Sequence, residues 1–352
     1  DDNKFLNERI IRIPVIPRYA NNFFLILNYL SFFIVSFFYS LSVLYKKKFK
    51  ILFLFCPSPI YSVLPIILVN KLFKVKTVLW VLDLWPDTII DLKKIKNKYL
   101  INFLKKIVKY IYNNSDLILA QSNSMKIEIE KITKNKCIFF PSWPEEGIGE
   151  SNIEYSKALN KKDSDVTRIM FTGNIGEAQS FITLIEAAKI LKTLTKIEWI
   201  IIGDGRFKKE LKKLIEINNL QKEFILIKPV PLSSIKSFLN HADALYLSLQ
   251  NNSTYQKTIP GKLQTYMSAQ KPIIASISGE AKEIIENSSS GFASDAEDTN
   301  GLVNNVIKFI NLTDKQKYDL GNNAKVFCDK NYVKENILND LKRNLEDLIK
   351  KQ

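Results

Sequence analysis

The sequence predicts an α/β protein made of two Rossmann-like, doubly wound domains, and three observations support this prediction. Short, continuously apolar runs alternate with amphipathic helical stretches along most of the chain. Repeated strand–helix units of this kind form parallel sheets with helices on both faces. The length of 352 residues exceeds what one hydrophobic core usually holds. A polar stretch from 146 to 166 interrupts the series, so we expect a linker there and a cleft faced by the carboxyl ends of both sheets.

The first domain, residues 1–145, is expected to be incomplete at its N-terminus. The chain begins at Asp1 without a methionine, and its first apolar run with strand character, Ile10–Ile16, lies close to that start. We therefore expect at least one strand–helix unit to be missing in front of it.

A long apolar helix is predicted from Phe23 to Tyr45. It has 23 residues without a charge, and three lysines, 46–48, follow directly. A helix of this length spans about 34 Å, which is enough to cross a bilayer. A strand at 51–55 follows at once, so the helix should pack on the sheet. We favour a helix whose outer face dips into the membrane interface, with the lysines near phospholipid headgroups; a plain core helix and a transmembrane helix are the alternatives.

The other elements continue the alternation of strands and helices. Ser122 is placed to cap the helix that follows it. In the first domain we expect helices at 61–73, 97–113 and 122–132, and strands at 51–55, 77–82, 116–120 and 136–140. In the second, residues 167–331, we expect strands at 168–172, 197–202, 223–228, 243–248, 272–276 and 291–294, with helices between them. Helices are also expected at 314–331 and 333–350, and the C-terminal segment 332–352 should pack back toward the first domain.

The charge of the chain suggests an anionic partner. The formal net charge is +15, from 51 basic and 36 acidic residues. Only six of the basic residues are arginine, and no basic cluster with interleaved aromatic residues is visible. Nucleic-acid binding usually relies on such features. We therefore expect a diphosphate-bearing substrate or an anionic membrane surface, and no nucleic acid.

Few residues could hold a metal ion or serve as a nucleophile. The chain has one histidine, His241, and three widely spaced cysteines. A zinc site, or a Ser-His or Cys-His pair, needs more such groups. Asp163 and Asp165 fall in the polar stretch and are interpreted as solvated linker. We expect no metal and no other cofactor, with reduced cysteines in a cytoplasmic protein.

Two corners of the type strand, glycine loop, helix carry the strongest functional signal. The first is Gly173–Gly176 and the second is Gly203–Gly205. Such corners point free backbone N–H groups and the positive end of a helix dipole at one place. A diphosphate would be stabilised there.

Several motifs taken together resemble the family 4 glycosyltransferases of GT-B fold. They are the two glycine corners, Asp83-Leu-Trp-Pro86, Pro260-Gly-Lys-Leu-Gln-Thr-Tyr-Met267, Lys271-Pro-Ile-Ile-Ala275 and Ser278-Gly-Glu280. The similarity runs from about Lys50 to the C-terminus, and the branch it resembles most contains fucosamine transferases of O-antigen and capsule synthesis. The resemblance implies a retaining, metal-independent transfer of a sugar, an N-acetylated deoxyhexosamine in that branch, from a nucleotide diphosphate donor that is commonly UDP-linked. The acceptor would be a glycan, often carried on a polyprenyl diphosphate at the inner face of the plasma membrane.

The resemblance also implies a set of contact residues. Those expected at the diphosphate are Gly173, Asn174, Gly176, Gln179, Gly205 and Arg206. Those expected at the nucleoside are Lys228 and Val230, through backbone groups, and Gln264. The candidate catalytic residues are Lys262, which would neutralise the leaving diphosphate, Glu280, which would bind donor-sugar hydroxyls, and Asp83, which would face the acceptor. Trp85 and Asp87 are weaker candidates for acceptor contact.

Four positions depart from the family pattern. Many members have an Arg and a Lys where this chain has Asn174 and Gln179, and two glutamates where it has Lys257 and Thr265. Since amides cannot neutralise a phosphate, Lys262 must supply more of the positive charge.

Two other functions stay open on the sequence. A nucleotide-sugar 2-epimerase shares the two-domain layout, but such enzymes depend on several histidines and acids in the cleft. A catalytically silent, membrane-associated scaffold is the non-enzymatic alternative, and it would not bind UDP.

Overall fold

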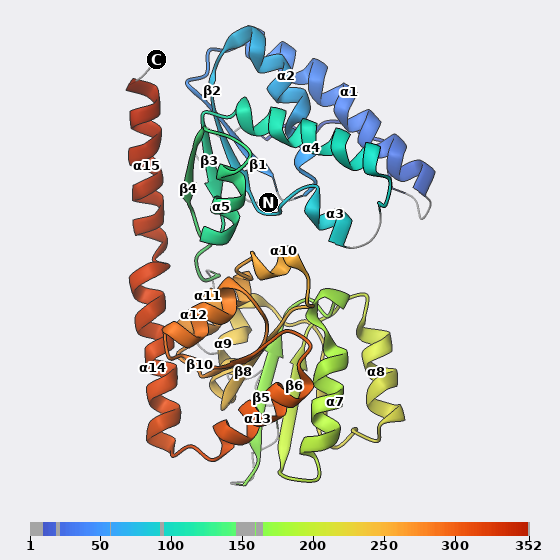
Figure 1. The fold of residues 1–352 in the computed structure, drawn as a ribbon, viewed down its shortest axis with the longest axis vertical. Coiled ribbons are helices and arrows are strands. Elements are labelled where there is room, and N and C mark those ends of the chain that lie inside the picture. The colour runs from blue at the N-terminus through green and yellow to red at the C-terminus, as the bar shows by residue number, and fades with distance from the viewer. Residues whose placement is uncertain are drawn as a thin grey trace. The chain divides into compact units, whose positions relative to one another are not determined.

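The computed structural model describes residues 10–18, 22–56, 58–91, 95–145, 159 and 165–350. Contacts divide the chain into two compact units, each with its own parallel sheet (Figure 1). The first unit comprises Asp1–Ala120, Lys126–Phe139 and Asn344–Gln352. The second comprises Gln121–Met125 and Phe140–Arg343. The predicted α/β class with parallel sheets is confirmed.

The first unit is built on four parallel strands in the order β1-β2-β3-β4. Their inner residues, such as Val78, Leu79, Ile118 and Leu119, are fully buried, as expected for strands covered on both faces. The order follows the chain, so the described part of this sheet has no point at which the strand order reverses. The strands are β1 (Ile51–Cys56), β2 (Lys76–Val81), β3 (Leu117–Ala120) and β4 (Lys136–Phe139).

Helices of the first unit begin where side chains cap them. The Asn97 side chain accepts hydrogen bonds from the backbone N–H groups of Tyr99 and Leu100 at the start of α4. Ser122 Oγ accepts from Met125 N at 3.0 Å, which confirms the predicted cap of α5. The helices are α1 (Asn22–Lys46), η1 (Ile60–Val63), α2 (Leu64–Phe73), α3 (Asp87–Asp91), α4 (Lys98–Asn113) and α5 (Asn123–Glu130).

The strand predicted at Ile10–Ile16 is wrong. Residues 10–18 form no strand, and Ile10 is 77% exposed. Pro14 and Pro17 lack the N–H that a strand ladder needs. The segment is held instead by α1, because Ile16 N donates to Ser31 Oγ and Ile16 O accepts from Asn28 Nδ2.

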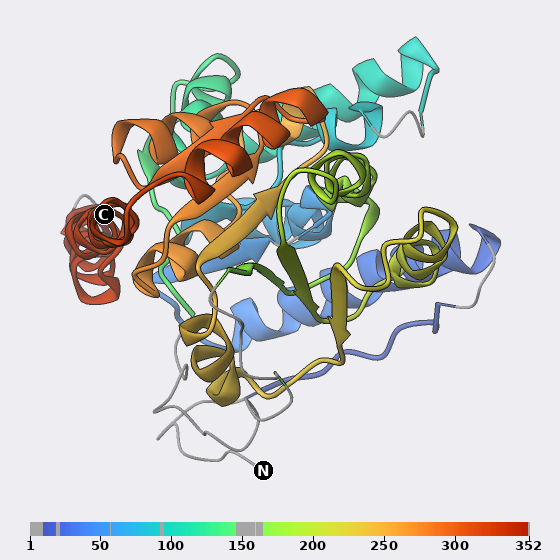
Figure 2. The ribbon, with the colours of Figure 1, turned by 90° about the horizontal axis from the view of Figure 1, so that it is seen from below.

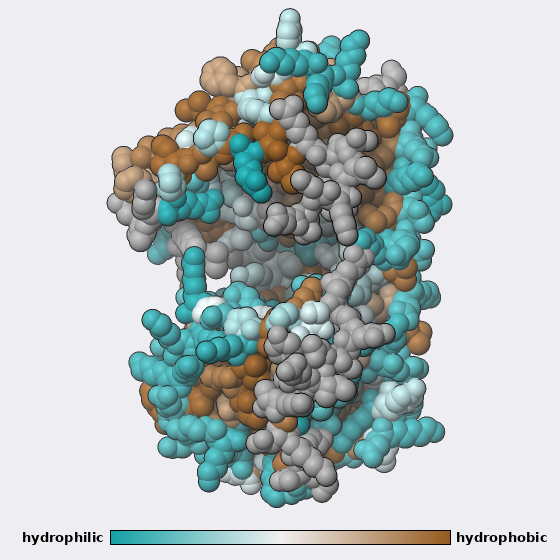
Figure 3. Space-filling view, turned by 180° about the vertical axis from the view of Figure 1, so that it is seen from behind, coloured by the Kyte–Doolittle hydropathy of each residue, from teal (hydrophilic) through white to brown (hydrophobic). Residues whose placement is uncertain are grey.

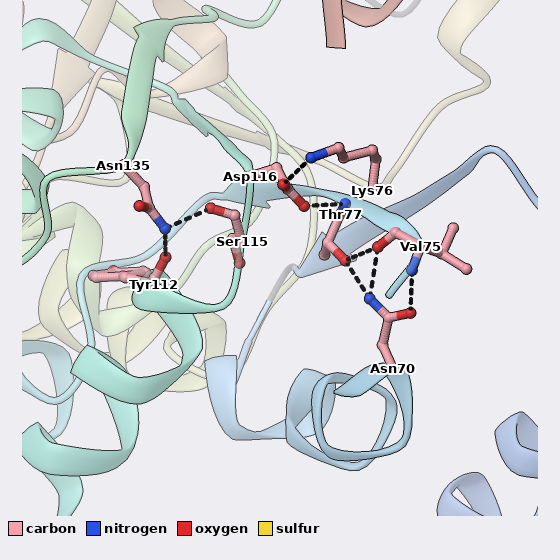
Figure 4. A network of polar contacts seen from close by, with 8 residues as sticks. All are labelled: Asn70, Val75, Lys76, Thr77, Tyr112, Ser115, Asp116 and Asn135. Carbon is pink, nitrogen blue, oxygen red and sulfur yellow. Dashed lines mark hydrogen bonds and ion pairs between the residues drawn. The ribbon is translucent and has the colours of Figure 1, made fainter. Parts of the chain in front are cut away.

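A polar network fastens the amino ends of the strands in the first unit (Figure 4). The Asp116 carboxylate accepts from Lys76 Nζ at 3.0 Å and from Thr77 N at 2.8 Å. The Asn70 amide bonds to Val75 and Thr77 on the same side of the sheet. These bonds hold the loops before β2 and β3 together, and most of the same residues line a cavity of about 680 Å³.

The second unit has a six-stranded parallel sheet in the order β10-β9-β8-β5-β6-β7. The order runs outward in both directions from the β5–β8 pair, so this sheet is doubly wound and has its switch point there. Ligands of such sheets bind at the switch point, beyond the carboxyl ends of the strands. The strands are β5 (Thr167–Thr172), β6 (Ile197–Ile202), β7 (Phe224–Ile227), β8 (Ala244–Ser248), β9 (Ile273–Ser276) and β10 (Gly291–Ser294).

Helices cover both faces of this sheet, and Figure 2 shows α13 and α9 on opposite sides of it. Ile169 and Phe171 of β5 join one core with α7 and α13, while Met170 between them is also fully buried on the other face. The helices are η2 (Glu177–Gln179), α7 (Phe181–Leu191), α8 (Lys208–Ile217), α9 (Leu232–Asn240), α10 (Ser253–Gln256), α11 (Gly261–Ser268), α12 (Glu280–Asn287), α13 (Thr299–Ile310), α14 (Asp314–Asn331) and α15 (Lys334–Lys350).

The contact units and the predicted domain boundaries differ in two places. Residues 121–125 group with the second unit because Gln121 Nε2 donates to Ile259 O at 3.2 Å and Ser122 Oγ donates to Lys257 O. Within the predicted C-terminal segment 332–352, only residues 344–352 group with the first unit. The predicted linker, 146–166, lies almost wholly outside the described residues.

Candidate functional site

Two glycine corners pack against each other at the carboxyl ends of β5 and β6, beside the switch point of the second sheet. Gly173 follows β5 with φ +121°, and Gly203 follows β6 with φ +148°. A Cβ on Gly203 would lie 1.9 Å from Gly173 O, which no side chain allows. Glycine is therefore required here both by the backbone conformation and by the close approach of the two loops.

Hydrogen bonds between the corners hold the Gly173–Gly176 loop in place and occupy two of its backbone N–H groups. Gly173 N donates to Ile202 O at 2.9 Å, and Ile175 N donates to Asp204 O at 2.7 Å. Within the described part of the chain, the N–H groups of Asn174 and Gly176 have no protein partner. A bound anion could thus take two N–H groups from this loop, and the N–H of Gly173 is already engaged.

The Asn174 carboxamide lies between two glycines. A Cβ on Gly176 would be 2.8 Å from Asn174 Nδ2, and a Cβ on Gly205 would be 2.7 Å from Asn174 Oδ1. The structure therefore brings together three of the predicted diphosphate contacts.

Lys262 supplies the positive charge at this place. It is the second residue of α11, and its Nζ donates to Gln179 Oε1 at 3.2 Å. The same Nζ lies 4.9 Å from the ring centroid of Phe171, the residue before the end of β5. A Cβ on Gly173 would be 2.8 Å from Lys262 Cε, so the lysine stem crosses directly over the glycine corner.

The environment of Lys262 favours loss of its proton. Burial lowers the pKa of its amine from 10.5 to about 8, and the negative charge of Glu145 opposes part of this shift. Among the described residues, no carboxylate forms an ion pair with Lys262, which is half-buried. A partly desolvated cation is favoured when a ligand compensates its charge. The arrangement is suited to an anion that arrives from outside.

The second corner carries further positive charge. Arg206 is exposed and lines a cavity of about 480 Å³ with Gly205, Asp204 and three lysines of α8. Lys208 of this set pairs with Asp204 at 3.7 Å and donates to Gly203 O. The loop after β7 lies next to this corner because Gly203 N donates to Ile227 O at 3.1 Å. In that loop the predicted nucleobase residues are accessible, Lys228 being exposed and Val230 half-buried.

Gln264 and Glu280 point into the protein rather than into open space. Gln264 is fully buried, and its amide, oriented so that its nitrogen donates, bonds to Pro260 O and Gly261 O. The Glu280 carboxylate accepts from Asn123 N at 2.9 Å and from Ser124 N at 2.6 Å, so it caps the start of α5. Their predicted roles at the donor stay predictions. The sequence predicts the Ser122 cap of α5 but not this second cap by Glu280, because nothing near Asn123 in sequence indicates a carboxylate more than 150 residues away.

The residues predicted to contact the acceptor lie after the carboxyl end of β2, close to residues that follow β1. Asp83 follows β2, and burial raises the pKa of its carboxyl while a hydrogen bond from Ser58 opposes the shift. The ring of Trp85 stands edge-on to Tyr61 at 5.4 Å. Tyr61 Oη and Trp85 Nε1 are buried without a hydrogen-bond partner in the described part of the chain. Tyr61 was not predicted, and its only sequence signal is its place shortly after β1.

Metal ligands do not cluster in the described part of the chain. Within residues 10–18, 22–56, 58–91, 95–145 and 165–350, no three His, Cys, Asp or Glu side chains are placed to share a metal ion. Cys56, Cys137 and Cys328 are free thiols in the core. Independence of a metal therefore stays a prediction.

Sequence relatives of this chain are glycosyltransferases. An uncharacterized glycosyltransferase of Methanocaldococcus jannaschii is 24% identical over 244 residues, 69% of this chain and 61% of the relative. The amylovoran biosynthesis glycosyltransferase AmsK of Erwinia amylovora is 28% identical over 191 residues, 52% of this chain and 47% of AmsK. The chain thus spans about three fifths of the first relative and about half of AmsK.

Solved structures share the fold. Sucrose-phosphate synthase of Thermosynechococcus elongatus superimposes with a TM-score of 0.75 at 13% identity, covering 97% of this chain and 84% of the synthase. HepE of Anabaena, solved in complex with UDP-glucose, gives a TM-score of 0.68 at 14% identity, covering 88% of this chain and 82% of HepE. These neighbours have the GT-B fold, so the fold predicted from the motifs is confirmed.

The model of the family described as glycosyl transferases group 1 matches residues 151–327, which is half of the chain and includes both glycine corners, Lys262 and Glu280. This chain belongs to the glycosyl transferases group 1 family.

Proposed function

We propose that the protein transfers a sugar from a nucleotide diphosphate donor, with retention of anomeric configuration and without a metal ion, in the synthesis of a cell-surface polysaccharide. The observation that carries the proposal is Lys262, a half-buried cation laid across the glycine corner at the end of β5. The family membership and the polysaccharide relative support the same reaction class. We further propose a UDP-linked donor, since HepE binds UDP-glucose, and an N-acetylated deoxyhexosamine as its sugar.

The departure of the diphosphate from the donor sugar requires a positive charge such as that of Lys262. As the sugar leaves the donor, negative charge grows on the diphosphate, and catalysis requires groups that stabilise it more in the transition state than before. Lys262 and the N–H groups of Asn174 and Gly176 can do this together. Gln179 holds the lysine amine at 3.2 Å and orients it toward the corner.

Titration calorimetry with UDP tests the donor site. We expect the wild-type chain to bind UDP and Lys262→Ala to lose most of that affinity. Lys236→Ala is the matched control, because Lys236 is an exposed lysine on α9 and is not among the residues that line the cavity at Arg206. Absence of any heat with the wild type would favour a scaffold without activity.

Product analysis tests the reaction class. Incubation with UDP-sugars and a glycan acceptor, followed by mass spectrometry, should show a transferred sugar, and the yield should persist in EDTA. A free nucleotide sugar with inverted configuration at one carbon would indicate an epimerase instead. Loss of activity in EDTA would contradict metal independence.

We also propose that the first unit rests on the inner face of the plasma membrane through α1. This helix is long and apolar enough to cross a membrane, and only 11% of its most apolar window is buried, so it is no ordinary core helix. Its inner side packs on α2. Figure 3 shows hydrophobic side chains gathered over this helix. Five of them, spaced three or four residues apart, are 53% to 64% exposed: Phe23, Ile26, Leu30, Ile34 and Phe38.

The charges at the end of α1 fit a lipid surface. Lys46, Lys47 and Lys48 are exposed directly after the apolar stripe. An apolar helical face followed by lysines is the pattern of helices that lie in the interface of an anionic membrane. An acceptor carried on a membrane lipid would then be within reach of the enzyme.

A further inference from the structure

A cavity at the amino edge of the first sheet takes no part in the proposed transfer. This amino-edge cavity has a volume of about 680 Å³, within the range of small-molecule sites. Its lining comes from the last turns of α2 and α4 and from the loops that lead into β2, β3 and β4. Many of the same residues form the polar network of Figure 4, so hydrogen bonds fix the walls of the cavity. The substrates are expected at the opposite edge, beyond the carboxyl ends of the strands.

Five lysines line the amino-edge cavity, against one carboxylate. The carboxylate is that of Asp116, which accepts a hydrogen bond from Lys76 Nζ at 3.0 Å. The formal charge of the lining is therefore five minus one, or +4. The lysines are Lys71, Lys74, Lys76, Lys134 and Lys136.

The contacts of two of these lysines leave their charge uncompensated. Lys71 Nζ lies 4.7 Å from the ring centroid of Tyr110 on α4. Lys136 Nζ donates to the amide oxygen of Asn344 at 2.8 Å. Because both partners are neutral, these contacts orient the ammonium groups without cancelling their charge.

Helix dipoles account for only part of the excess positive charge. The C-termini of α2 and α4 lie at the cavity, and each carries a partial charge of about −0.5. Together they offset about one of the four positive charges. Lys74 and Lys134 are exposed, and their side chains form no hydrogen bond or ion pair with any residue that the structure describes. The cavity is therefore suited to a ligand with several negative charges.

The lysines stand on two sides of the cavity. Lys71 and Lys74 lie at the end of α2, before β2, whereas Lys134 and Lys136 lie at the start of β4. Since β3 runs between these two strands, the two pairs are about 10 Å apart at the backbone. A ligand with two phosphate groups matches this spacing better than one with a single group.

The lysine run at the end of α1 reaches the same edge of the sheet. Lys46, Lys47 and Lys48 are exposed and precede β1 by only a few residues. The first residue of β1, Ile51, is paired with Lys76 in the sheet. The cavity thus lies near the C-terminal end of the helix that is proposed to contact the membrane.

We propose that the amino-edge cavity binds a ligand that carries two or more phosphate groups, at a site separate from the donor and acceptor sites. Lysine ammonium groups bind phosphate by charge and by charge-assisted hydrogen bonds. Two sources share this chemistry: a phospholipid headgroup with two phosphates, such as that of cardiolipin, and a soluble polyphosphate. The inference does not rest on the proposed transfer, because none of the residues assigned to the donor or the acceptor lines this cavity.

Lys74 allows a variant that removes charge without weakening the fold. Its backbone is left-handed, with φ 56°, at the end of α2. Glycine adopts this conformation more readily than lysine, so Lys74→Gly should unfold at the same or a higher urea concentration than wild type. Lys134→Ala removes a second exposed charge. Lys106→Ala is the matched control, because Lys106 is an exposed lysine on α4 that does not line the cavity.

Titration calorimetry of the full chain with tripolyphosphate tests the site, with UDP present so that the probe cannot bind at the donor site. We expect tripolyphosphate to bind more tightly than inorganic phosphate. The double variant Lys74→Gly, Lys134→Ala should weaken its binding about tenfold or more, which corresponds to about 1.4 kcal/mol. Lys106→Ala should bind it like the wild type. An unchanged affinity in the double variant, or an equal loss with Lys106→Ala, would overturn the proposal.

Vesicles identify the source of the phosphates. Co-sedimentation compares phosphatidylcholine vesicles that contain cardiolipin with vesicles that contain twice as much phosphatidylglycerol, so that the charge is matched. A preference for cardiolipin that the double variant loses identifies a lipid headgroup. Binding of tripolyphosphate without that preference identifies a soluble ligand, and either result supports the site. Absence of UDP binding would contradict the donor site alone, since Lys74 and Lys134 belong to the other unit.

Discussion

At the scale of single residues, the position of the Lys262 side chain requires glycine at position 173. The Lys262 stem passes so close to Gly173 that any β-carbon there would collide with Cε, and the backbone at Gly173 has φ +121°. Gly173→Ala should therefore destabilise the fold by about 1–3 kcal/mol and displace the lysine. UDP affinity should fall with it.

Gly261→Ala is the control for that substitution. Gly261 is the first residue of α11, beside Lys262, and a Cβ there would meet nothing within 4 Å. Because alanine favours a helix over glycine, this variant should be neutral or more stable by up to about 1 kcal/mol. Urea unfolding and UDP titration of both variants measure the contrast, and equal effects of the two would refute the steric explanation.

The pKa of Lys262 predicts a pH dependence of donor binding. Its amine is protonated below a pKa of about 8 and neutral above it. Since only the protonated form attracts a diphosphate, loss of this charge should weaken UDP binding as the pH rises above 7. From pH 7 to pH 8.5 the dissociation constant should increase about fourfold by proton linkage. Calorimetry on wild type and Lys262→Met measures this, and a slope of the same size in Lys262→Met would assign it to another group.

The sequence predicts the positions of some site residues better than the orientation of others. The strand–glycine–helix pattern determines the backbone positions at the first corner. Four residues therefore lie close together, as the motifs indicate: Gly173, Asn174, Gly176 and Lys262. Gln264 is different, because whether a helical side chain faces solvent or the core depends on elements distant in the chain. Its amide folds back on the carbonyls at the start of its own helix.

At the scale of elements, most strands could be predicted because each is a nearly unbroken run of apolar residues. Strands such as β6 are buried on both faces, so their sequence is a nearly unbroken apolar run, Ile197–Ile202. Ile10–Ile16 has a similar composition but no partner strand and two prolines, 14 and 17, in or beside it. The composition of a segment cannot show whether a neighbouring strand is available to pair with it.

The helix cap formed by Glu280 gives a prediction at the same scale. Its carboxylate receives two backbone N–H groups at the start of α5. Glu280→Ala should lower the free energy of unfolding by about 1–2 kcal/mol through the lost cap, and Glu280→Gln by less, since one acceptor oxygen remains. Glu283→Ala, in the same first turn of α12 but exposed, should change stability little.

Kinetics of the same three variants distinguish the cap from a role at the donor sugar. If Glu280 serves mainly as a cap, unfolding in urea changes while the ratio of activities among UDP-sugars does not. An unchanged unfolding midpoint with a large fall in kcat would contradict the capping role and favour contact with donor hydroxyls.

At the scale of the whole molecule, topology determines where a ligand can bind. The strand order of the second sheet reverses between β5 and β8. The first glycine corner lies at the end of β5 and the second at the end of the neighbouring strand, β6. The parallel alternation predicts such a switch point but not which strands form it. The domain boundaries were harder to predict, because residues 121–125 join the second unit through single hydrogen bonds that leave no pattern in the sequence.

Membrane binding is the prediction that involves the full chain. Wild-type protein should co-sediment with anionic vesicles and less with neutral ones, because apolar contact and lysine charge both contribute. Leu30→Glu with Ile34→Glu should abolish sedimentation, since each places a charge in the middle of the exposed stripe of α1. Ile217→Glu is the control, because Ile217 is equally apolar and 63% exposed but lies at the end of α8. Carbonate at high pH should release the bound protein if α1 lies in the interface, whereas protein that resists extraction would show that α1 crosses the bilayer.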